Sequence, residues 1–143
     1  MKLLKIVGSL ALALPLTFGA FSAQAEQAYL AEVAENHPAL AKQFQDMMQP
    51  FMREADWLAN YGTSAPGSKV SIDDTNYIVY WGCKPHDCTS ENYAVLVEPK
   101  SQELVAGAFV RNHYKEQNIT HSNVTWLGNA ELDVARALAS FLY

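Results

Sequence analysis

Cysteine, basic residues and long apolar runs are all scarce in this chain. Its 143 residues include two cysteines, and 10 Lys and Arg stand against 15 Asp and Glu, for a formal net charge of −5. After residue 25 no apolar run approaches the roughly 20 residues that cross a bilayer. The sequence also has no internal repeat, low-complexity tract or linker. We therefore expect the chain after residue 25 to form one domain that does not span a membrane.

The long apolar run that the chain does have lies at its start and has the three parts of a secretory signal. Lys2 and Lys5 precede an apolar stretch, and Ala23-Gln24-Ala25 is an A-x-A cleavage site. We expect a signal peptide over residues 1–25, cleaved after Ala25, and a mature domain over residues 26–143. The product should be soluble and exported into an oxidising compartment.

Cleavage would make the protein more acidic. The signal peptide carries two of the 10 basic residues, so the mature chain would keep 8 against 15 acidic residues, a net charge of −7. This sign disfavours nucleic acid as a partner, because phosphate binding needs positive charge. The charge would attract a basic protein partner, or it could serve only to keep an exported protein soluble.

Apolar residues at helical spacing predict helices at both ends of the mature chain. In the first helix Pro38 suits the first turn and Pro50 should end the helix. In the last helix Asn129 suits the N-cap. The apolar positions are Leu40, Phe44, Met47, Met48 and Phe51 in the first helix, and Leu132, Ala135, Leu138, Ala139 and Leu142 in the last.

The middle of the chain has the alternating period of strands. Two predicted strands flank a turn at Asp73-Asp74, two more flank a turn over 99–102, and a fifth follows. We expect Trp57, Trp81 and Trp126 in or near the core. The order of elements predicts an α+β domain, in which N- and C-terminal helices pack on an antiparallel sheet of about five strands. The predicted strands are 69–72, 76–82, 92–97, 104–110 and 119–127.

The two cysteines bracket the hexapeptide Cys83-Lys84-Pro85-His86-Asp87-Cys88, which falls between two predicted strands. An exported protein with one cysteine pair most simply forms one disulfide. We therefore expect a protruding hairpin loop closed by Cys83 and Cys88. The chain-entropy relation gives such a short ring only about 2 kcal/mol of stabilisation. Its larger expected effect is to fix the direction of His86, with Pro85 restricting the backbone.

This hexapeptide resembles the signature of the inhibitor of vertebrate lysozyme (Ivy) family. The size of the exported chain, its N-terminal helix and the stretch Thr125-Trp126-Leu127 fit the same resemblance. The resemblance implies a periplasmic, non-enzymatic α+β protein without cofactor or metal, which inhibits c-type lysozyme by inserting the loop into the active-site cleft. Members are often dimeric, so a homodimer is also an expectation, although no sequence feature decides the oligomeric state.

By this resemblance His86 would hydrogen-bond the two catalytic carboxyl groups of the lysozyme. Such groups lie about 5 Å apart in a retaining glycosidase, and an imidazole has a nitrogen on each of two opposite edges. Lys84 would either meet acceptors on the cleft wall or be solvated. Asp87 would either contact a basic residue of the lysozyme or, as is commoner, cap its own turn. Pro85 would act through its backbone.

Other functions remain open at this point. Cys83, His86 and Cys88 could bind zinc together with His37, His113 or His121, although the spacing fits no usual zinc pattern. An exported thiol oxidoreductase would need C-x-x-C, whereas the chain has C-x₄-C. We find no hydrolase motif, and a solvated turn explains Asp73 and Asp74. A different lysozyme class or a bacterial wall enzyme could also be the target.

Overall fold

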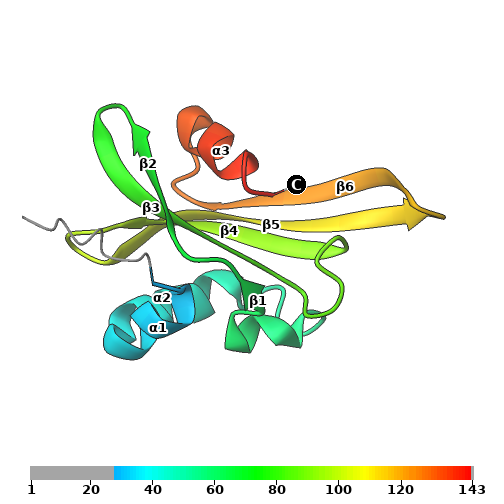
Figure 1. Ribbon diagram of the computed structural model, residues 1–143, viewed down its shortest axis with the longest axis horizontal. Coiled ribbons are helices and arrows are strands. Elements are labelled where there is room, and N and C mark those ends of the chain that lie inside the picture. The colour runs from blue at the N-terminus through cyan, green and yellow to red at the C-terminus, as the bar shows by residue number, and fades with distance from the viewer. Residues whose placement is uncertain (1–27, 143) are drawn as a thin grey trace, which may run out of the picture.

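A computed structural model describes residues 28–142, which form three layers with a sheet in the middle. Two helices, α1 and α2, cover one face of the six-stranded antiparallel sheet, and α3 covers the other face (Figure 1). The α+β class, the antiparallel sheet and the terminal helices that the sequence predicts are confirmed. The elements are α1 (Leu30–Asn36), α2 (Pro38–Met48), the 3-10 helix η1 (Asp56–Asn60), β1 (Thr63–Ser64), β2 (Ser68–Ile72), β3 (Thr75–Cys83), β4 (Glu91–Glu98), β5 (Glu103–Lys115), β6 (Asn118–Gly128) and α3 (Leu132–Ala139).

The sheet runs in the order β1-β3-β4-β5-β6, and β2 pairs with the other end of β3. Its middle strand β4 is buried on both faces, which explains its nearly continuous apolar sequence. Tyr93, Val95 and Val97 pack in the core cluster under α1 and α2, while Ala94 and Leu96 pack in the cluster under α3. Each face of the sheet therefore has its own hydrophobic core.

The predicted turns form as the sequence indicates. Asp73 and Asp74 both have positive φ, 48° and 61°, and they join Ile72 to its partner Thr75. Two consecutive left-handed residues make the two-residue hairpin turn that matches strand twist. Pro38 occupies the first turn of α2, and that helix ends at Met48, before Pro50.

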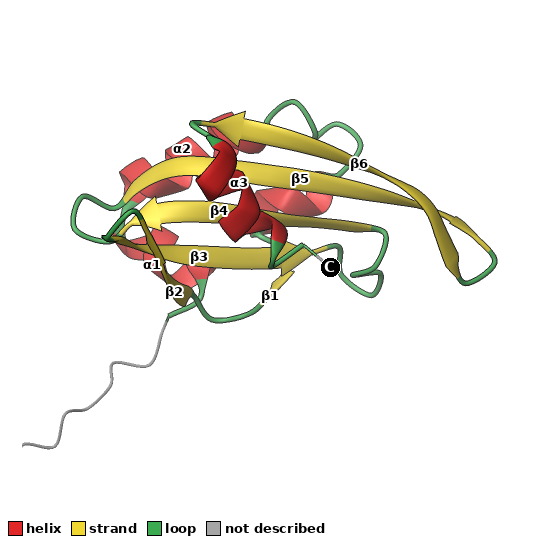
Figure 2. Cartoon of the chain, turned by 90° about the horizontal axis from the view of Figure 1, so that it is seen from above, coloured by secondary structure: helices red, strands yellow, loops and turns green. Residues whose placement is uncertain are grey.

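Two sequence predictions at the C-terminal side are wrong. Asn129 is not the N-cap of α3, because its N–H donates to the carbonyl of Val105 (3.0 Å) and the helix begins only at Leu132, after Glu131. Trp126 is 42% exposed and not part of the core, because β6 is an edge strand. The hairpin of β5 and β6 is also longer than predicted and projects beyond the rest of the sheet (Figure 2).

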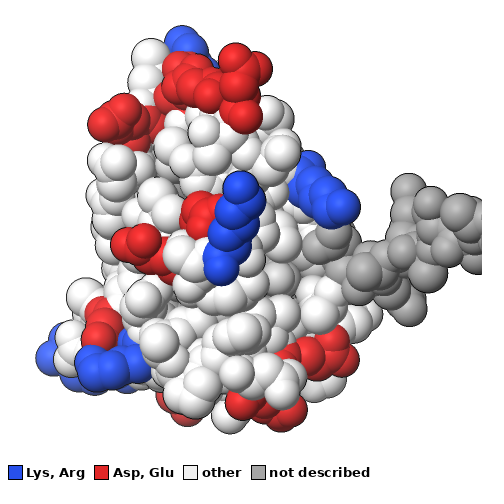
Figure 3. Space-filling view, turned by 90° about the vertical axis from the view of Figure 1, so that its left-hand side faces the viewer, with Lys and Arg blue, Asp and Glu red and all other residues white. Residues whose placement is uncertain are grey.

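The predicted signal peptide and its cleavage site lie outside the described residues. Within residues 28–142 no helix combines the length and the apolar character needed to cross a bilayer. Figure 3 shows the end of the molecule that lies away from the loop between β3 and β4. Acidic side chains there form several separate groups with Lys and Arg between them, so this end carries no single acidic patch.

Phe44 is the centre of the core under α2, where its ring lies 4.9 Å from that of Tyr61 and 5.1 Å from that of Tyr93. We predict that Phe44→Ala lowers the free energy of unfolding by about 3–5 kcal/mol, the cost of a large buried cavity, as measured by urea denaturation. Lys42→Ala on the exposed side of α2 is the control. Its surface ion pair with Asp46 should be worth less than about 0.5 kcal/mol, and equal losses in the two variants would contradict this packing.

Candidate partner-binding loop

The two cysteines close the loop that joins β3 to β4. Cys83 is the last residue of β3, lies opposite Asn92 of β4 and also pairs with Thr63 of β1, so it is held between two strands. It is fully buried and bonded to Cys88, with 4.7 Å between the two Cα atoms. The predicted disulfide is thus present. One end of the loop is fixed by the sheet itself.

The tip of the loop is a tight turn that exposes a histidine. The N–H of Asp87 donates to the carbonyl of Lys84 (3.0 Å), with Pro85 and His86 between them. His86 has a φ of 64°. A type II turn has proline at its second position and a residue with positive φ at its third position, as here. Pro85, His86 and Asp87 are exposed. The turn therefore carries the imidazole at the surface, on a backbone that proline and the hydrogen bond restrict.

The charged side chains of the loop make their contacts within it. The Asp87 carboxylate accepts from the hydroxyl of Ser90 (2.6 Å) and lies 3.8 Å from the ammonium of Lys84. Both Asp87 and Lys84 are about half exposed, so this ion pair contributes little stability. The contacts orient Asp87 toward the returning part of the loop and leave His86 as its outward-facing imidazole.

Strand β5 holds the returning part of the loop from the side. The backbone N–H of Asn112 donates to the carbonyl of Ser90 (2.8 Å), and its side-chain amide donates to the carbonyl of Thr89 (2.7 Å). The hydroxyl of Tyr114 donates to the same Thr89 carbonyl. The hydroxyl of Ser122 on β6 in turn donates to the Asn112 side-chain oxygen. The backbone after Cys88 is thus tied to two further strands.

A buried carboxylate holds the loop from the other face of the sheet, the one that α1 and α2 cover. Glu91, 7% exposed, accepts from the guanidinium of Arg111 (2.7 Å) and from the indole N–H of Trp57 (3.0 Å). Arg111 also donates to Glu54 (2.9 Å). The hydrogen bond to Glu91 raises the pKa of the Arg111 guanidinium further above its ordinary value. The network satisfies a charge that would be costly if buried alone.

All six predicted site residues lie in one loop, but the sequence patterns did not predict the residues that support this loop. The motif identifies Cys83 to Cys88, whereas Glu91, Arg111, Asn112 and Tyr114 look like ordinary polar strand residues in the sequence. The sequence gives one partial indication for Glu91. It directly precedes a predicted strand of mostly apolar residues, and a carboxylate that is buried there needs a partner.

The structure also bears on the zinc alternative. The two sulfurs are bonded to each other, which leaves neither as a thiolate ligand. His113 and His121 lie opposite each other in the hairpin of β5 and β6, with ring centroids 4.1 Å apart. Across residues 28–142 no group of three or more His, Cys, Asp and Glu side chains is placed to hold a metal ion.

The fold and the loop define a small α+β protein with an exposed, disulfide-closed loop that the sheet supports. Residues 39–140 match the family model "Inhibitor of vertebrate lysozyme (Ivy)", and the chain belongs to this family. It is also 33% identical over 84 residues to the proteins named "Inhibitor of vertebrate lysozyme" from Escherichia coli strain K12 and from Escherichia coli O157:H7. Each match covers 59% of this chain and 50% of the relative, so the matched part spans half the length of these relatives.

Asn112 should keep the loop closed against β5. We predict that Asn112→Ala speeds hydrogen exchange of the loop amides by about 5- to 15-fold, because one buried side-chain hydrogen bond to Thr89 is lost. Exchange mass spectrometry of a peptide that covers residues 84–92 would measure this effect. Asn123→Ala, the same change at an exposed position of β6, should leave the peptide unchanged. Equal protection in both variants would refute the role of Asn112.

Proposed function

We propose that this protein inhibits c-type lysozymes by inserting the loop over 83–88 into their active-site cleft. The observation that carries the proposal is the exposed imidazole of His86, held at the tip of a disulfide-closed turn in a chain of the Ivy family. The names of its relatives support lysozyme as the kind of partner. The protein would act as an inhibitor and not as an enzyme.

The chemistry of the cleft suits the His86 side chain. A retaining glycosidase holds two carboxyl groups about 5–5.5 Å apart, one of which has a raised pKa. An imidazolium could donate to both as carboxylates, and a neutral imidazole could donate to one and accept from its protonated partner. Either arrangement places two charge-assisted hydrogen bonds where substrate would otherwise bind.

The rest of the loop would position this contact and not add much energy to it. Lys84 and Asp87 are paired with each other, so in the proposed complex they would line the edge of the contact, where charges matter less. Pro85 would keep the turn in its bound shape. The loop would therefore lose little entropy on binding, which favours affinity.

Charge supports the same kind of partner. Lysozymes of this type are basic, and the mature chain proposed here, residues 26–143, has a net charge of −7. Opposite net charges speed association at low salt. We also propose that the chain is exported to the periplasm after cleavage behind Ala25, where inhibition of lysozyme would protect peptidoglycan.

His86 should dominate the binding energy. We predict that His86→Ala weakens inhibition by about 2–4 kcal/mol, or about 30- to 1,000-fold, since hot-spot contacts fall in this range. A turbidity assay with bacterial cell walls and a c-type lysozyme would give the inhibition constant. His37→Ala, an exposed histidine between α1 and α2, is the control and should inhibit like the unmodified protein. An unchanged constant for His86→Ala would rule out the plug mechanism.

The disulfide should act on affinity more than on the fold. We predict that Cys83→Ala with Cys88→Ala weakens lysozyme binding by about 10- to 100-fold, because the loop must then be ordered on binding. Surface plasmon resonance would measure the dissociation rate. Circular dichroism should show the sheet intact, since Cys83 stays paired with both neighbouring strands. Identical dissociation rates for the double variant and the parent would disprove preorganisation.

A further inference from the structure

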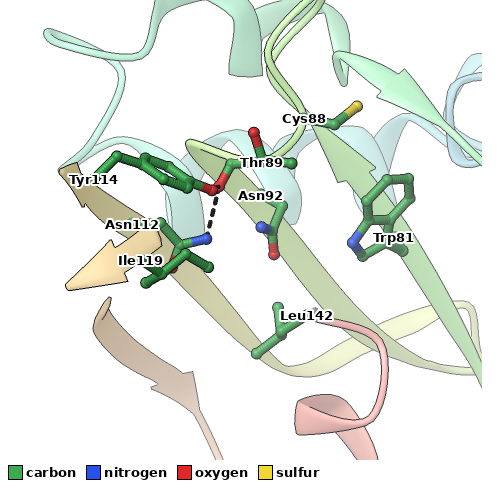
Figure 4. A pocket seen from close by; sticks show the side chains of 8 residues that line it. All are labelled: Trp81, Cys88, Thr89, Asn92, Asn112, Tyr114, Ile119 and Leu142. Carbon is green, nitrogen blue, oxygen red and sulfur yellow. Dashed lines mark hydrogen bonds between the residues drawn. The ribbon is translucent and has the colours of Figure 1, made fainter. Parts of the chain in front are cut away.

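A pocket of about 250 Å³ lies behind the returning part of the loop, on the face of the sheet that carries α3 (Figure 4). Trp81 and Asn92 line it from β3 and β4, and Leu142 lines it from the segment after α3. Ile119 and Tyr114, 48% and 39% exposed, come from the projecting hairpin of β5 and β6. The more exposed residues mark its opening and the buried ones its inner end.

Two buried polar atoms at this pocket have no hydrogen-bond partner among the described residues. They are the indole nitrogen of Trp81 and the side-chain oxygen of Asn92, which is itself only 3% exposed. Buried polar groups in folded proteins are almost always paired, so each such exception calls for a ligand, a water or another explanation. One of these atoms is a donor and the other an acceptor.

The donor and the acceptor are close enough to serve one ligand. Asn92 pairs with Cys83 and Trp81 pairs with Ala94 in the antiparallel ladder, so Trp81 and Asn92 are diagonal neighbours on the face covered by α3. Diagonal neighbours have Cα atoms about 7–8 Å apart, within reach of long side chains. In Figure 4 the nitrogen edge of the Trp81 ring faces the side of the pocket where Asn92 lies.

The side chains of Asn112 and Tyr114 at the pocket are already hydrogen-bonded within the protein. The Asn112 side-chain amide and the Tyr114 hydroxyl both donate to the carbonyl of Thr89. The Asn112 side-chain oxygen accepts from Ser122. The residues that line the pocket include no charged side chain. A mostly apolar pocket in which the Trp81 indole N–H and the Asn92 carboxamide oxygen have no partner favours a neutral ligand that carries both an acceptor and a donor.

We infer that this pocket binds a small neutral molecule that carries a secondary amide, such as the acetamido group of an N-acetylated amino sugar. The amide carbonyl accepts from the Trp81 indole, the amide N–H donates to the Asn92 oxygen, and the acyl methyl packs against Ile119 and Leu142. The pocket is smaller than sites for drug-sized ligands, about 300–1,000 Å³, which suits one such group. This site is separate from the exposed face of His86 and does not depend on lysozyme inhibition.

Nuclear magnetic resonance of the ¹⁵N-labelled mature chain, with its disulfide intact, tests this inference. The probes are N-methylacetamide, N-acetylglucosamine and glucose, which has hydroxyls but no amide. We expect saturable shifts of the Trp81 indole N–H and of the Thr89 amide with both amides and not with glucose. Tighter binding of N-acetylglucosamine would identify an amino sugar as the source of the amide. Equal binding would assign recognition to the amide alone.

Two results would overturn the inference. One is an equal response to glucose, which would show that hydroxyls suffice. The other is no saturable shift with either amide, which would mean that the two atoms are bridged by buried water only.

Removal of the acceptor provides a second readout. Asn92→Leu should fold normally, since the lost oxygen has no partner in the structure, and should bind N-methylacetamide at least about tenfold more weakly, as the loss of one buried hydrogen bond predicts. Asn123→Leu, on the opposite face of β6, is the control and should bind as the parent does. If Asn92→Leu fails to fold, Trp81→Phe removes the donor while it keeps an aromatic wall, with Thr89 as reporter. Undiminished amide binding in the folded variant would refute the site.

Discussion

The buried carboxylate of Glu91 is the group on which the position of the loop depends. It lies where the chain re-enters the sheet, and it is paired with the guanidinium of Arg111 and the indole of Trp57. Removing one partner from a buried ion pair is strongly destabilising, by about 3–5 kcal/mol, because the other charge stays behind uncompensated. A shift of the loop base that separates Glu91 from Arg111 would leave the Glu91 carboxylate with the Trp57 indole as its partner, at a cost that the one-third exposure of Arg111 reduces. The pair therefore selects one register of β4 against β5 at the loop, beyond what backbone hydrogen bonds alone would specify.

The loop is held from both faces of the sheet, and the two sets of contacts differ in kind. Glu91 faces the core under α1 and α2 through a charged pair, whereas the disulfide and the Asn112 amide act on the α3 face and along β5. In a free chain the ordering of these residues would cost about 1–2 kcal/mol each. Here folding has already ordered them, and two separate hydrophobic cores supply the stability for it. A partner that meets the loop meets a shape that is already set, which is the physical basis of the proposed inhibition.

Local patterns in the sequence predict the fold well, because alternation, turn residues and helix periodicity are local properties. They fail where the structure depends on pairing between strands that are far apart in the sequence. Counting outward from the turn at 99–102 pairs Glu98 with Glu103 and would pair Glu91 with Val110, but a bulge between Leu96 and Val97 moves the register by one residue and brings Glu91 opposite Arg111. The support of the loop depends on that bulge, which no local pattern in the sequence marks. Asn129 illustrates the same limit, since a backbone bond to the neighbouring strand overrides its preference for a helix N-cap.

His86 has a backbone conformation that is unusual for a residue with a side chain. A left-handed φ at a residue other than glycine is uncommon and costs free energy, although histidine tolerates it better than most residues. Glycine would relieve that cost and would form the same type II turn with Pro85. The strained position is sustained by the hydrogen bond between Asp87 and Lys84 and by the closed disulfide. The turn thus holds an imidazole at a position whose left-handed backbone favours glycine, at some cost to the stability of the fold. Backbone strain is often found at functional sites, and the proposed contact of the His86 ring with a lysozyme would be consistent with it.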